Sequence, residues 1–272
     1  MLPRTDTREE NMEKDYQYGL LNATNDSVFV KMKKGQNIAG YPIGIVYIED
    51  VFYPLMPGNV VNASTYPFPV RMIPVKNINC DELFACDEKV GGAIREACET
   101  LVKEGVRAIS GACGFFGNYQ LEMAETFDVP VALSSLIQVP WVLSTLKPGQ
   151  KLAILTADAK SITERLLMNC GITKKMTERL IIKDLATSEN FSCVIKNRGE
   201  WDNDLARKDV VDRAIEAVRE HGETGAILLE CSDMPPYASA IQREVGLPVF
   251  DFITLIKWLY SAVAQRPYEG FI

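Results

Sequence analysis

The stretch VRAISGACGFFG at residues 106–117 has a counterpart in GAILLECSD at residues 225–233. Each begins as a short apolar run typical of a buried parallel strand and then changes to small or polar residues around a cysteine, Cys113 or Cys231. An open α/β sheet places its chemistry where a strand ends in a loop before a helix. The repeated arrangement therefore predicts one site built from two halves, with a thiol from each.

The rest of the chain alternates apolar runs with helical patterns, which are recognised by apolar residues at helical spacing. We predict strands at 41–48, 70–75, 106–110, 129–133, 152–156, 179–182, 226–229 and 247–250, and helices at 87–104, 118–127, 138–146, 159–169, 205–221, 236–245 and 253–264. Alternating strands and helices indicate parallel sheets covered on both faces. The expected fold class is α/β, with two similar subdomains of mainly parallel sheets flanked by helices and the active site in the cleft between them.

An equal spacing in the two halves supports this duplication. Cys113 precedes Pro130 by 130 − 113 = 17 residues, and Cys231 precedes Pro248 by 248 − 231 = 17 residues. The polar segment 183–204 is expected to be a surface excursion, and the Pro- and Asn-rich stretch 49–69 a long functional loop. The predicted organisation is an N-terminal arm at 1–38, a first subdomain at 39–148 completed by the C-terminal helix 252–272, and a second subdomain at 149–251.

The composition is that of an ordinary globular protein, with 47% hydrophobic and 24% charged residues. The formal net charge of −7 argues against nucleic acid or an anionic membrane surface as a partner. No apolar run reaches the ~18 residues of a membrane span, and the N-terminus shows no secretory pattern. Seven cysteines without a CxxC pair fit a reducing, cytoplasmic location, and a single histidine argues against a zinc site.

That histidine, His221, follows a helical pattern and precedes Gly222. The position is typical of a residue at a helix C-terminus, where the macrodipole favours positive charge. Ser-His-Asp and Cys-His catalysis both need a histidine beside the nucleophile. Acid–base chemistry is therefore expected to come from other groups.

A cysteine at the end of a strand can act as an acid or a base. Loop N–H groups favour the thiolate, and a thiol pKa of roughly 8.5 can fall toward neutrality there. Two thiols facing each other across a substrate can remove a proton from one side of a carbon and return one to the other, without a metal or organic cofactor. The alternative is that both are small buried hydrophobes. That interpretation is given to the other cysteines, Cys80, Cys86, Cys98, Cys170 and Cys193.

Four short motifs lie at corresponding points of the two halves: IVYI at 45–48, SGACG at 110–114, LAILTA at 152–157 and LECSDM at 229–234. With these motifs the chain resembles, over about residues 38–265, the aspartate/glutamate racemase superfamily, which includes hydantoin racemases, maleate isomerases and arylmalonate decarboxylase. The resemblance implies an active site between two similar α/β subdomains, with Cys113 and Cys231 as the acid/base pair and no cofactor. It also favours a homo-oligomer, a dimer or larger.

Two departures from the family pattern bear on the substrate. Amino-acid racemases carry Cys-Asn-Thr at their first thiol, whereas Cys113 is followed by Gly-Phe-Phe. Their second thiol is usually followed by Thr and then a carboxylate or His, whereas Ser232 and Asp233 stand at those positions. The lost polar groups predict a substrate other than aspartate or glutamate. The two phenylalanines, Phe115 and Phe116, either line a more apolar pocket or pack beneath the helix.

Further substrate-binding candidates follow from the resemblance and from position. Thr156 ends the strand that opens the second half, where the family places a hydroxyl on the substrate carboxylate. Asp233 either tunes Cys231 or caps the helix predicted at 236–245. Asn59 and Asn62 either reach over a ligand from the long loop or make local turns. The predicted substrate-binding residues are Gly114, Thr156, Ser134, Ser135, Ser232, Asp233, Asn59 and Asn62.

The leading hypothesis is a cofactor-independent racemase or epimerase that inverts a carbon-acid centre in a small amino-acid-like or hydantoin-like carboxylate. A second hypothesis is an enzyme of the maleate isomerase or decarboxylase kind, in which one cysteine acts as nucleophile or proton donor. A third is a small-molecule binding protein that kept the cleft without turnover.

Overall fold

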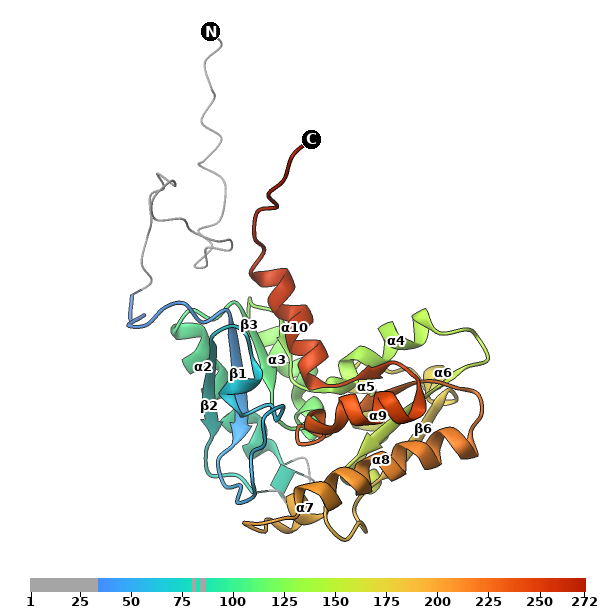
Figure 1. The fold of residues 1–272 in the computed structure, drawn as a ribbon. Coiled ribbons are helices and arrows are strands. Elements are labelled where there is room, and N and C mark those ends of the chain that lie inside the picture. The colour runs from blue at the N-terminus through green and yellow to red at the C-terminus, as the bar shows by residue number, and fades with distance from the viewer. Residues whose placement is uncertain (1–33, 80–81, 84–86) are drawn as a thin grey trace.

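The computed structural model describes residues 34–79, 82–83 and 87–272. Most of the predicted N-terminal arm, together with Cys80 and Cys86, lies outside these residues. The described part forms two α/β halves that follow each other along the chain (Figure 1).

Each half contains a four-stranded sheet in which every pairing is parallel. The first sheet has the order β2-β1-β3-β4, formed by β1 (Ile43–Ile48), β2 (Val70–Val75), β3 (Ala108–Gly111) and β4 (Val131–Ala132). The second has the equivalent order β6-β5-β7-β8, formed by β5 (Lys151–Thr156), β6 (Leu180–Asp184), β7 (Thr224–Leu229) and β8 (Val249–Phe250). The shared order confirms the predicted fold class of two similar α/β subdomains.

Helices flank both sheets, and several begin as a 3-10 turn (η) just after a strand. Within the described residues they are η2 (Ala63–Thr65), α2 (Glu88–Lys103), η3 (Gly114–Tyr119), α3 (Gln120–Thr126), η4 (Ser135–Gln138), α4 (Val139–Thr145), η5 (Ala159–Ser161), α5 (Glu164–Asn169), α6 (Lys174–Thr177), α7 (Cys193–Lys196), α8 (Asn203–Glu220), η6 (Pro235–Tyr237), α9 (Ala238–Val245) and α10 (Phe252–Val263). The connections between strands thus carry the helices that parallel sheets require.

The repeated proline has the same structural role in both halves. The N–H of Ile109 donates to the carbonyl of Pro130 at 2.9 Å, and the N–H of Ile227 donates to the carbonyl of Pro248 at 2.9 Å. Because proline has no N–H to return a hydrogen bond, it sits at the start of an edge strand. This is why β4 and β8 begin two residues later than the predicted strands at 129–133 and 247–250.

The core runs from one half into the other. Ile109 of β3, Leu152 and Ile154 of β5, and Leu228 of β7 belong to a single buried cluster. Each fully buried side chain of this size contributes about 1.5–3 kcal/mol of transfer free energy. The shared core holds the two sheets together and so determines where their carboxyl ends meet.

The last helix returns to the first sheet (Figure 1). Asp251 caps α10 through a reciprocal capping box with Thr254. Side chains of Phe252, Leu255 and Ile256 then pack with those of β1 and β3. This packing brings the C-terminal helix onto the first sheet. The residue limits given for the two subdomains stay a prediction.

The segment 183–204 differs from the predicted surface excursion. Phe191 is 0% exposed, and its ring stacks on that of Trp201 and meets that of Tyr237 edge-on. Cys193, in the short helix α7, is also fully buried. The prediction was wrong for residues 191–194, whereas residues 196–200 are exposed as expected. The buried run is too short to show a period among the polar residues around it.

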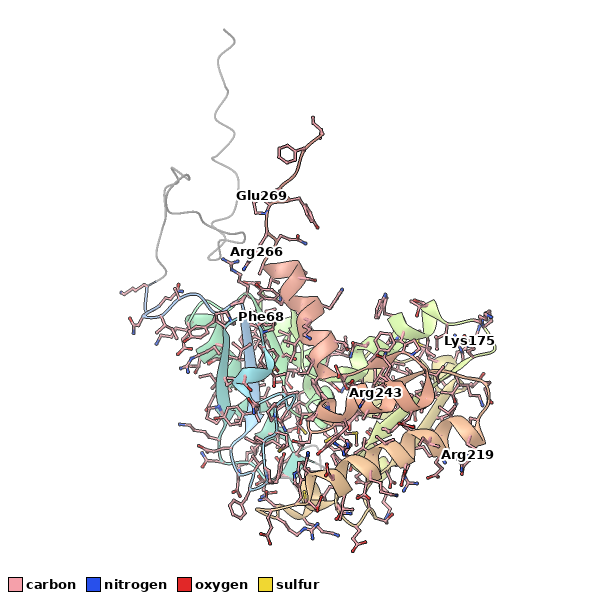
Figure 2. The ribbon with its side chains drawn as sticks, in the orientation of Figure 1. Phe68, Lys175, Arg219, Arg243, Arg266 and Glu269 are labelled. Atoms are coloured by element: carbon pink, nitrogen blue, oxygen red, sulfur yellow. The ribbon has the colours of Figure 1, made fainter. Side chains whose placement is uncertain are left out.

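Charged side chains cover the outside of the molecule, among them the exposed Lys175, Arg219 and Arg243 (Figure 2). Such residues are almost never buried without a partner. No helix in the described part of the chain is long and apolar enough to cross a membrane.

Candidate active site

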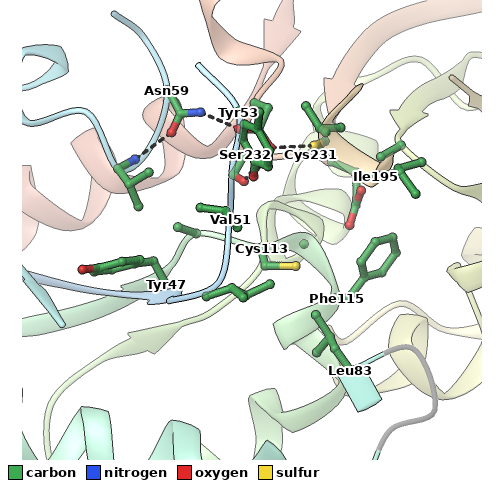
Figure 3. Close-up of a pocket in the computed structure, with 18 of the residues that line it drawn as sticks. Tyr47, Val51, Tyr53, Asn59, Leu83, Cys113, Phe115, Ile195, Cys231 and Ser232 are labelled. Atoms are coloured by element: carbon green, nitrogen blue, oxygen red, sulfur yellow. Dashed lines mark hydrogen bonds between the residues drawn. The ribbon is translucent and has the colours of Figure 1, made fainter. Parts of the chain in front are cut away.

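A pocket lies where the carboxyl ends of the two sheets face each other (Figure 3). Its walls come from the loops after β1, β3, β5 and β7 and from the segment around α7. Its cavity volume of about 80 Å³ suits a small molecule. Both predicted thiols, Cys113 and Cys231, line it.

Cys113 follows β3 and directly precedes η3, with an extended backbone at φ −158°. The N–H of Ala112 donates to the carbonyl of Val46 at 2.8 Å, which ties this loop to the end of β1. Gly114 comes next and lies against the other half, because a Cβ there would be 1.6 Å from Oε1 of Glu230. A residue without a side chain is therefore required where the two cysteine loops meet.

Cys231 occupies the equivalent point after β7 and is 9% exposed. Its Sγ donates a hydrogen bond to Oδ2 of Asp233 at 3.4 Å. Burial raises the pKa of the Cys231 thiol well above its usual value, and the charge of Asp233 adds to this effect. Cys231 is therefore held as the neutral thiol.

Asp233 is the centre of a hydrogen-bonded cluster that spans the two halves. Besides the thiol, its carboxylate accepts from Nδ2 of Asn59, from the hydroxyl of Tyr53 at 3.3 Å and from that of Ser232 at 3.4 Å. Burial raises the pKa of Asp233, while these donors lower it. η6 begins at Pro235 without a side-chain cap. Of the two roles left open for Asp233, the structure therefore supports the contact with Cys231.

Tyr53 is a pocket residue that the sequence did not reveal. Burial raises the pKa of Tyr53, as does the charge of Asp233, so its hydroxyl stays protonated and donates. The loop that carries it crosses to the second half, where the N–H of Val60 donates to the carbonyl of Ser232 at 3.4 Å. A lone tyrosine in an irregular loop has no periodic pattern that could have marked it.

Glu230 is the second residue that was missed. It is 0% exposed and its Oε2 accepts a hydrogen bond from Oγ1 of Thr156 at 2.8 Å. Burial raises the pKa of Glu230 to about 7. A charged residue directly after four apolar positions of β7 was the available signal, since a fully buried glutamate is rare without a function.

Four predicted substrate-binding residues use their polar groups elsewhere and do not line the pocket. Thr156 donates to Glu230, and Ser134 accepts from the N–H of Leu136 at the start of η4. Ser135 donates to the carbonyl of Leu229 at 3.0 Å, and Asn62 caps η2. The other predicted residues, Gly114, Asn59, Ser232 and Asp233, do line it.

The two phenylalanines after Gly114 divide between the two alternatives. Phe115 lines the pocket, whereas Phe116 is fully buried beneath the helix. The pocket also receives Val194 and Ile195 from the segment around α7. Apolar walls of this kind exclude water and strengthen the electrostatic interactions between the polar groups inside.

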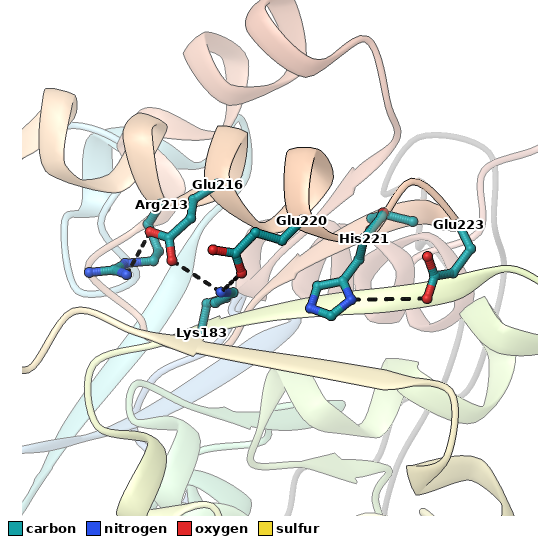
Figure 4. Close-up of polar contacts among 7 residues, drawn as sticks. Lys183, Arg213, Glu216, Glu220, His221 and Glu223 are labelled. Carbon is teal, nitrogen blue, oxygen red and sulfur yellow. Dashed lines mark hydrogen bonds and ion pairs between the residues drawn. The ribbon is translucent and has the colours of Figure 1, made fainter.

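His221 lies at the C-cap of α8, as predicted. Its Nδ1 is 4.0 Å from a carboxylate oxygen of Glu223, beside a group of surface ion pairs that includes Lys183 and Glu216 (Figure 4). It does not line the pocket. In residues 34–79, 82–83 and 87–272, no three His, Cys, Asp or Glu side chains are grouped to hold a metal ion.

None of the family models compared with the chain matches it. Among curated proteins, the chain is 29% identical over 244 residues to dimethylsulfoniopropionate lyase 7 of Emiliania huxleyi, which covers 86% of this chain and 70% of that protein. It is 26% identical over 243 residues to dimethylsulfoniopropionate lyase of Durusdinium sp. clade D, covering 87% and 80%. A third relative, dimethylsulfoniopropionate lyase 6 of Emiliania huxleyi, is covered over 63% of its length.

Solved structures of the same fold include allantoin racemase from Klebsiella pneumoniae, with a TM-score of 0.57 at 21% identity, covering 81% of this chain and 87% of that one. Picrophilus torridus aspartate racemase gives 0.53 at 19% identity, covering 82% and 94%. Unliganded arylmalonate decarboxylase gives 0.52 at 17% identity, covering 84% and 94%. These are similarities of fold.

Proposed function

The chain has the fold of the aspartate/glutamate/hydantoin racemase superfamily, and we propose that it is an enzyme that removes a proton from the carbon next to a substrate carboxylate. One observation carries the proposal: Cys113 and Cys231, from equivalent loops of the two halves, border one pocket (Figure 3). A small carbon acid between them has a proton acceptor on one side and a proton donor on the other. The proton transfer itself requires only side chains of this chain.

The surroundings of the two thiols assign them different roles in this proposal. Cys231 is buried beside Asp233 and Glu230, which keeps its proton in place and makes it the acid. Cys113 is only partly buried and faces the same cavity. Cys113, as the thiolate, is therefore the proposed base.

The proposed reaction is a β-elimination. The Cys113 thiolate takes the α-proton, and the electron pair of that C–H bond moves onto the carboxylate as an enediolate. This pair then forms a double bond to the β-carbon while the leaving group departs with the pair of its own bond. With dimethylsulfoniopropionate the products are acrylate and dimethyl sulfide, and Cys113 holds the proton. The match to dimethylsulfoniopropionate lyases over 86% of the chain supports this substrate.

The charges of the pocket also favour a substrate with a positive group. The described lining residues include the carboxyls of Asp158 and Asp233 and no Lys, Arg or His. They also include the rings of Tyr47 and Tyr53, whose faces attract a desolvated cation. A sulfonium or ammonium group therefore suits this cavity.

A second candidate is racemisation or epimerisation of a small amino-acid-like or hydantoin-like carboxylate. The placement of the thiols in two different halves favours it, because inversion needs an acid and a base on opposite faces of the carbon. In that reaction Cys113 and Cys231 exchange roles according to the hand of the substrate.

One experiment separates these functions. The enzyme is incubated in D₂O with dimethylsulfoniopropionate and, separately, with small amino acids and hydantoins. Dimethyl sulfide is measured in the headspace. Deuterium at the α-carbon is measured by NMR, and its chirality by chiral chromatography. Release of dimethyl sulfide that Cys113→Ser abolishes and Cys98→Ala retains supports elimination, since Cys98 lies in α2 and does not line the pocket. Deuterium uptake with inversion supports racemisation. If the compounds bind but neither reaction occurs, both enzymatic proposals are refuted and a binding protein is favoured.

A further inference from the structure

Glu230 is the most enclosed carboxyl of the pocket, and its position is fixed from two sides. Its backbone N–H donates to the carbonyl of Leu155 at 2.8 Å, which holds it at the end of β7. Its Oε2 accepts from the hydroxyl of Thr156 at 2.8 Å. Its Oε1, by contrast, is buried without a hydrogen-bond partner. Buried polar atoms are nearly always paired, so this oxygen calls for an explanation.

The unpaired oxygen lies between the two cysteine loops. It touches Gly114 so closely that a Cβ at that position would be 1.6 Å away. Glu230 directly precedes Cys231, and Gly114 directly follows Cys113. An acceptor group of a ligand held between the thiols would therefore lie beside this carboxyl.

The groups facing Glu230 favour its neutral form. The pKa of Glu230 is raised to about 7: burial raises it most, the hydrogen bond from Thr156 lowers it and the charge of Asp158 raises it. Cys170 from the end of α5 also faces it, and burial raises the pKa of that thiol to about 12 and that of Cys231 well above its usual value. Both thiols are therefore uncharged neighbours. No cationic side chain is among the described residues that line the pocket.

Since Oε2 accepts from Thr156, the proton of a neutral Glu230 resides on Oε1. A buried O–H without an acceptor is unfavourable until a ligand supplies one. The carboxylate of the substrate is such an acceptor. Thr156 was predicted to meet that carboxylate itself, but its hydroxyl is used by Glu230, which lines the pocket with the two thiols, whereas Thr156 does not.

We propose that Glu230 is a further catalytic residue, which donates a hydrogen bond from Oε1 to an oxygen of the substrate carboxylate. The role of Glu230 in the reaction rests on the proposed function and adds a residue to it. When Cys113 takes the α-proton, the electron pair of the C–H bond moves onto the carboxylate as an enediolate. A donor already in place stabilises charge where it develops, and Glu230 keeps its proton throughout. Thr156 is a positioning residue that holds Oε2.

The test measures binding rather than turnover. Binding of propionate, a carboxylate without a leaving group, is followed by calorimetry between pH 6 and 8.5 for the wild type, Glu230→Gln and the control Glu244→Gln, an exposed residue of α9. Once the pH exceeds the midpoint of Glu230, wild-type and control affinity should fall about tenfold per pH unit, because only the protonated fraction binds. Glu230→Gln carries an amide that does not titrate, so its affinity should stay constant over this range.

A second variant tests the same group from its partner. Thr156→Val removes the hydrogen bond that lowers the pKa of Glu230, so the midpoint of propionate binding should move to higher pH. This variant decides the matter if Glu230→Gln does not fold. If the hydrogen bond between Thr156 and Glu230 is only structural, the pH midpoint of propionate binding should be unchanged in Thr156→Val.

The results that overturn the proposal are the same pH dependence in the wild type and Glu230→Gln, or no binding of propionate by the wild type. Failure of the lyase proposal looks different. Dimethylsulfoniopropionate is then not cleaved, while propionate still binds with a midpoint that depends on Glu230 and Thr156.

Discussion

Replacing Gly114 by alanine tests whether the two cysteine loops are in the contact described. The added Cβ would lie 1.6 Å from Oε1, 2.3 Å from the carboxyl carbon and 2.7 Å from the backbone oxygen of Glu230. Displacing this carboxyl breaks its hydrogen bond with Thr156, which costs about 1 kcal/mol. Overpacking of a rigid interior adds about 1–3 kcal/mol. Gly114→Ala is therefore expected to lower the free energy of unfolding by about 2–4 kcal/mol.

Urea unfolding followed by circular dichroism measures this loss. Gly92→Ala is the matched control, because Gly92 lies exposed on α2 with no atom within 4 Å of its added Cβ. It should gain up to about 1 kcal/mol from helix propensity. In the double variant Gly114→Ala/Glu230→Ala two of the three close contacts vanish. The double variant should therefore lose about 1 kcal/mol or more less stability than the sum of the losses of the two single variants. If Gly114→Ala is as stable as the wild type, the described contact between the loops is incorrect.

Three further predictions concern burial and charge. Phe191→Ala should lower the free energy of unfolding, measured in urea, by about 3–5 kcal/mol, because the ring is fully buried. A loss below ~1 kcal/mol would contradict the burial of this part of segment 183–204. Asp233→Asn removes a negative charge beside Cys231, so alkylation of Cys231 by iodoacetamide, followed by mass spectrometry, should begin at lower pH; an unchanged profile contradicts the contact. The pKa of Glu230 is raised on folding, so its contribution to stability is complete below its unfolded pKa near 4.5 and is lost as the pH rises to about 7. Urea unfolding between pH 5 and 8 should therefore show Glu230→Gln becoming more stable relative to the wild type. A difference in stability that stays constant over this range refutes the raised pKa.

The sequence predicted the duplication because both halves repeat one set of backbone constraints. An apolar strand, a cysteine loop and a proline that can accept but not donate recur at the same interval. The structure shows this proline in the same hydrogen bond twice, from Ile109 to Pro130 and from Ile227 to Pro248. Patterns of this kind are local, so they can be read without knowing the fold.

The candidate site was only partly predictable, since the state of several groups depends on the opposite half. Glu230 is buried because the loop around Gly114 closes over it, and no local pattern reports that contact. Tyr53 reaches Asp233 from 180 positions away along the chain. Neither distance along the sequence nor residue type alone indicates such partners.

Two of the residues that were predicted but do not line the pocket share a physical reason. Ser134 and Asn62 carry short polar side chains near helix starts, where they bond to nearby backbone groups, whereas Ser135 donates to the carbonyl of Leu229 in the other half. Such local bonds compete with a ligand for the same atoms. Their positions were correctly predicted to be near strand ends and loops, but the partners of their side chains were not.

The return of α10 to the first sheet has a consequence for synthesis on the ribosome. The face of β1 that carries Ile43 and Ile45 is covered by α10, yet 263 − 132 = 131 residues separate the end of β4 from the end of that helix. At roughly 5–20 residues per second, this face waits about 7–26 s for its cover. Nascent chains arrested after α9 should accordingly bind a hydrophobic dye, and the released full chain should not. The first half to be translated is thus among the last to close, and chaperones have their longest opportunity to bind there.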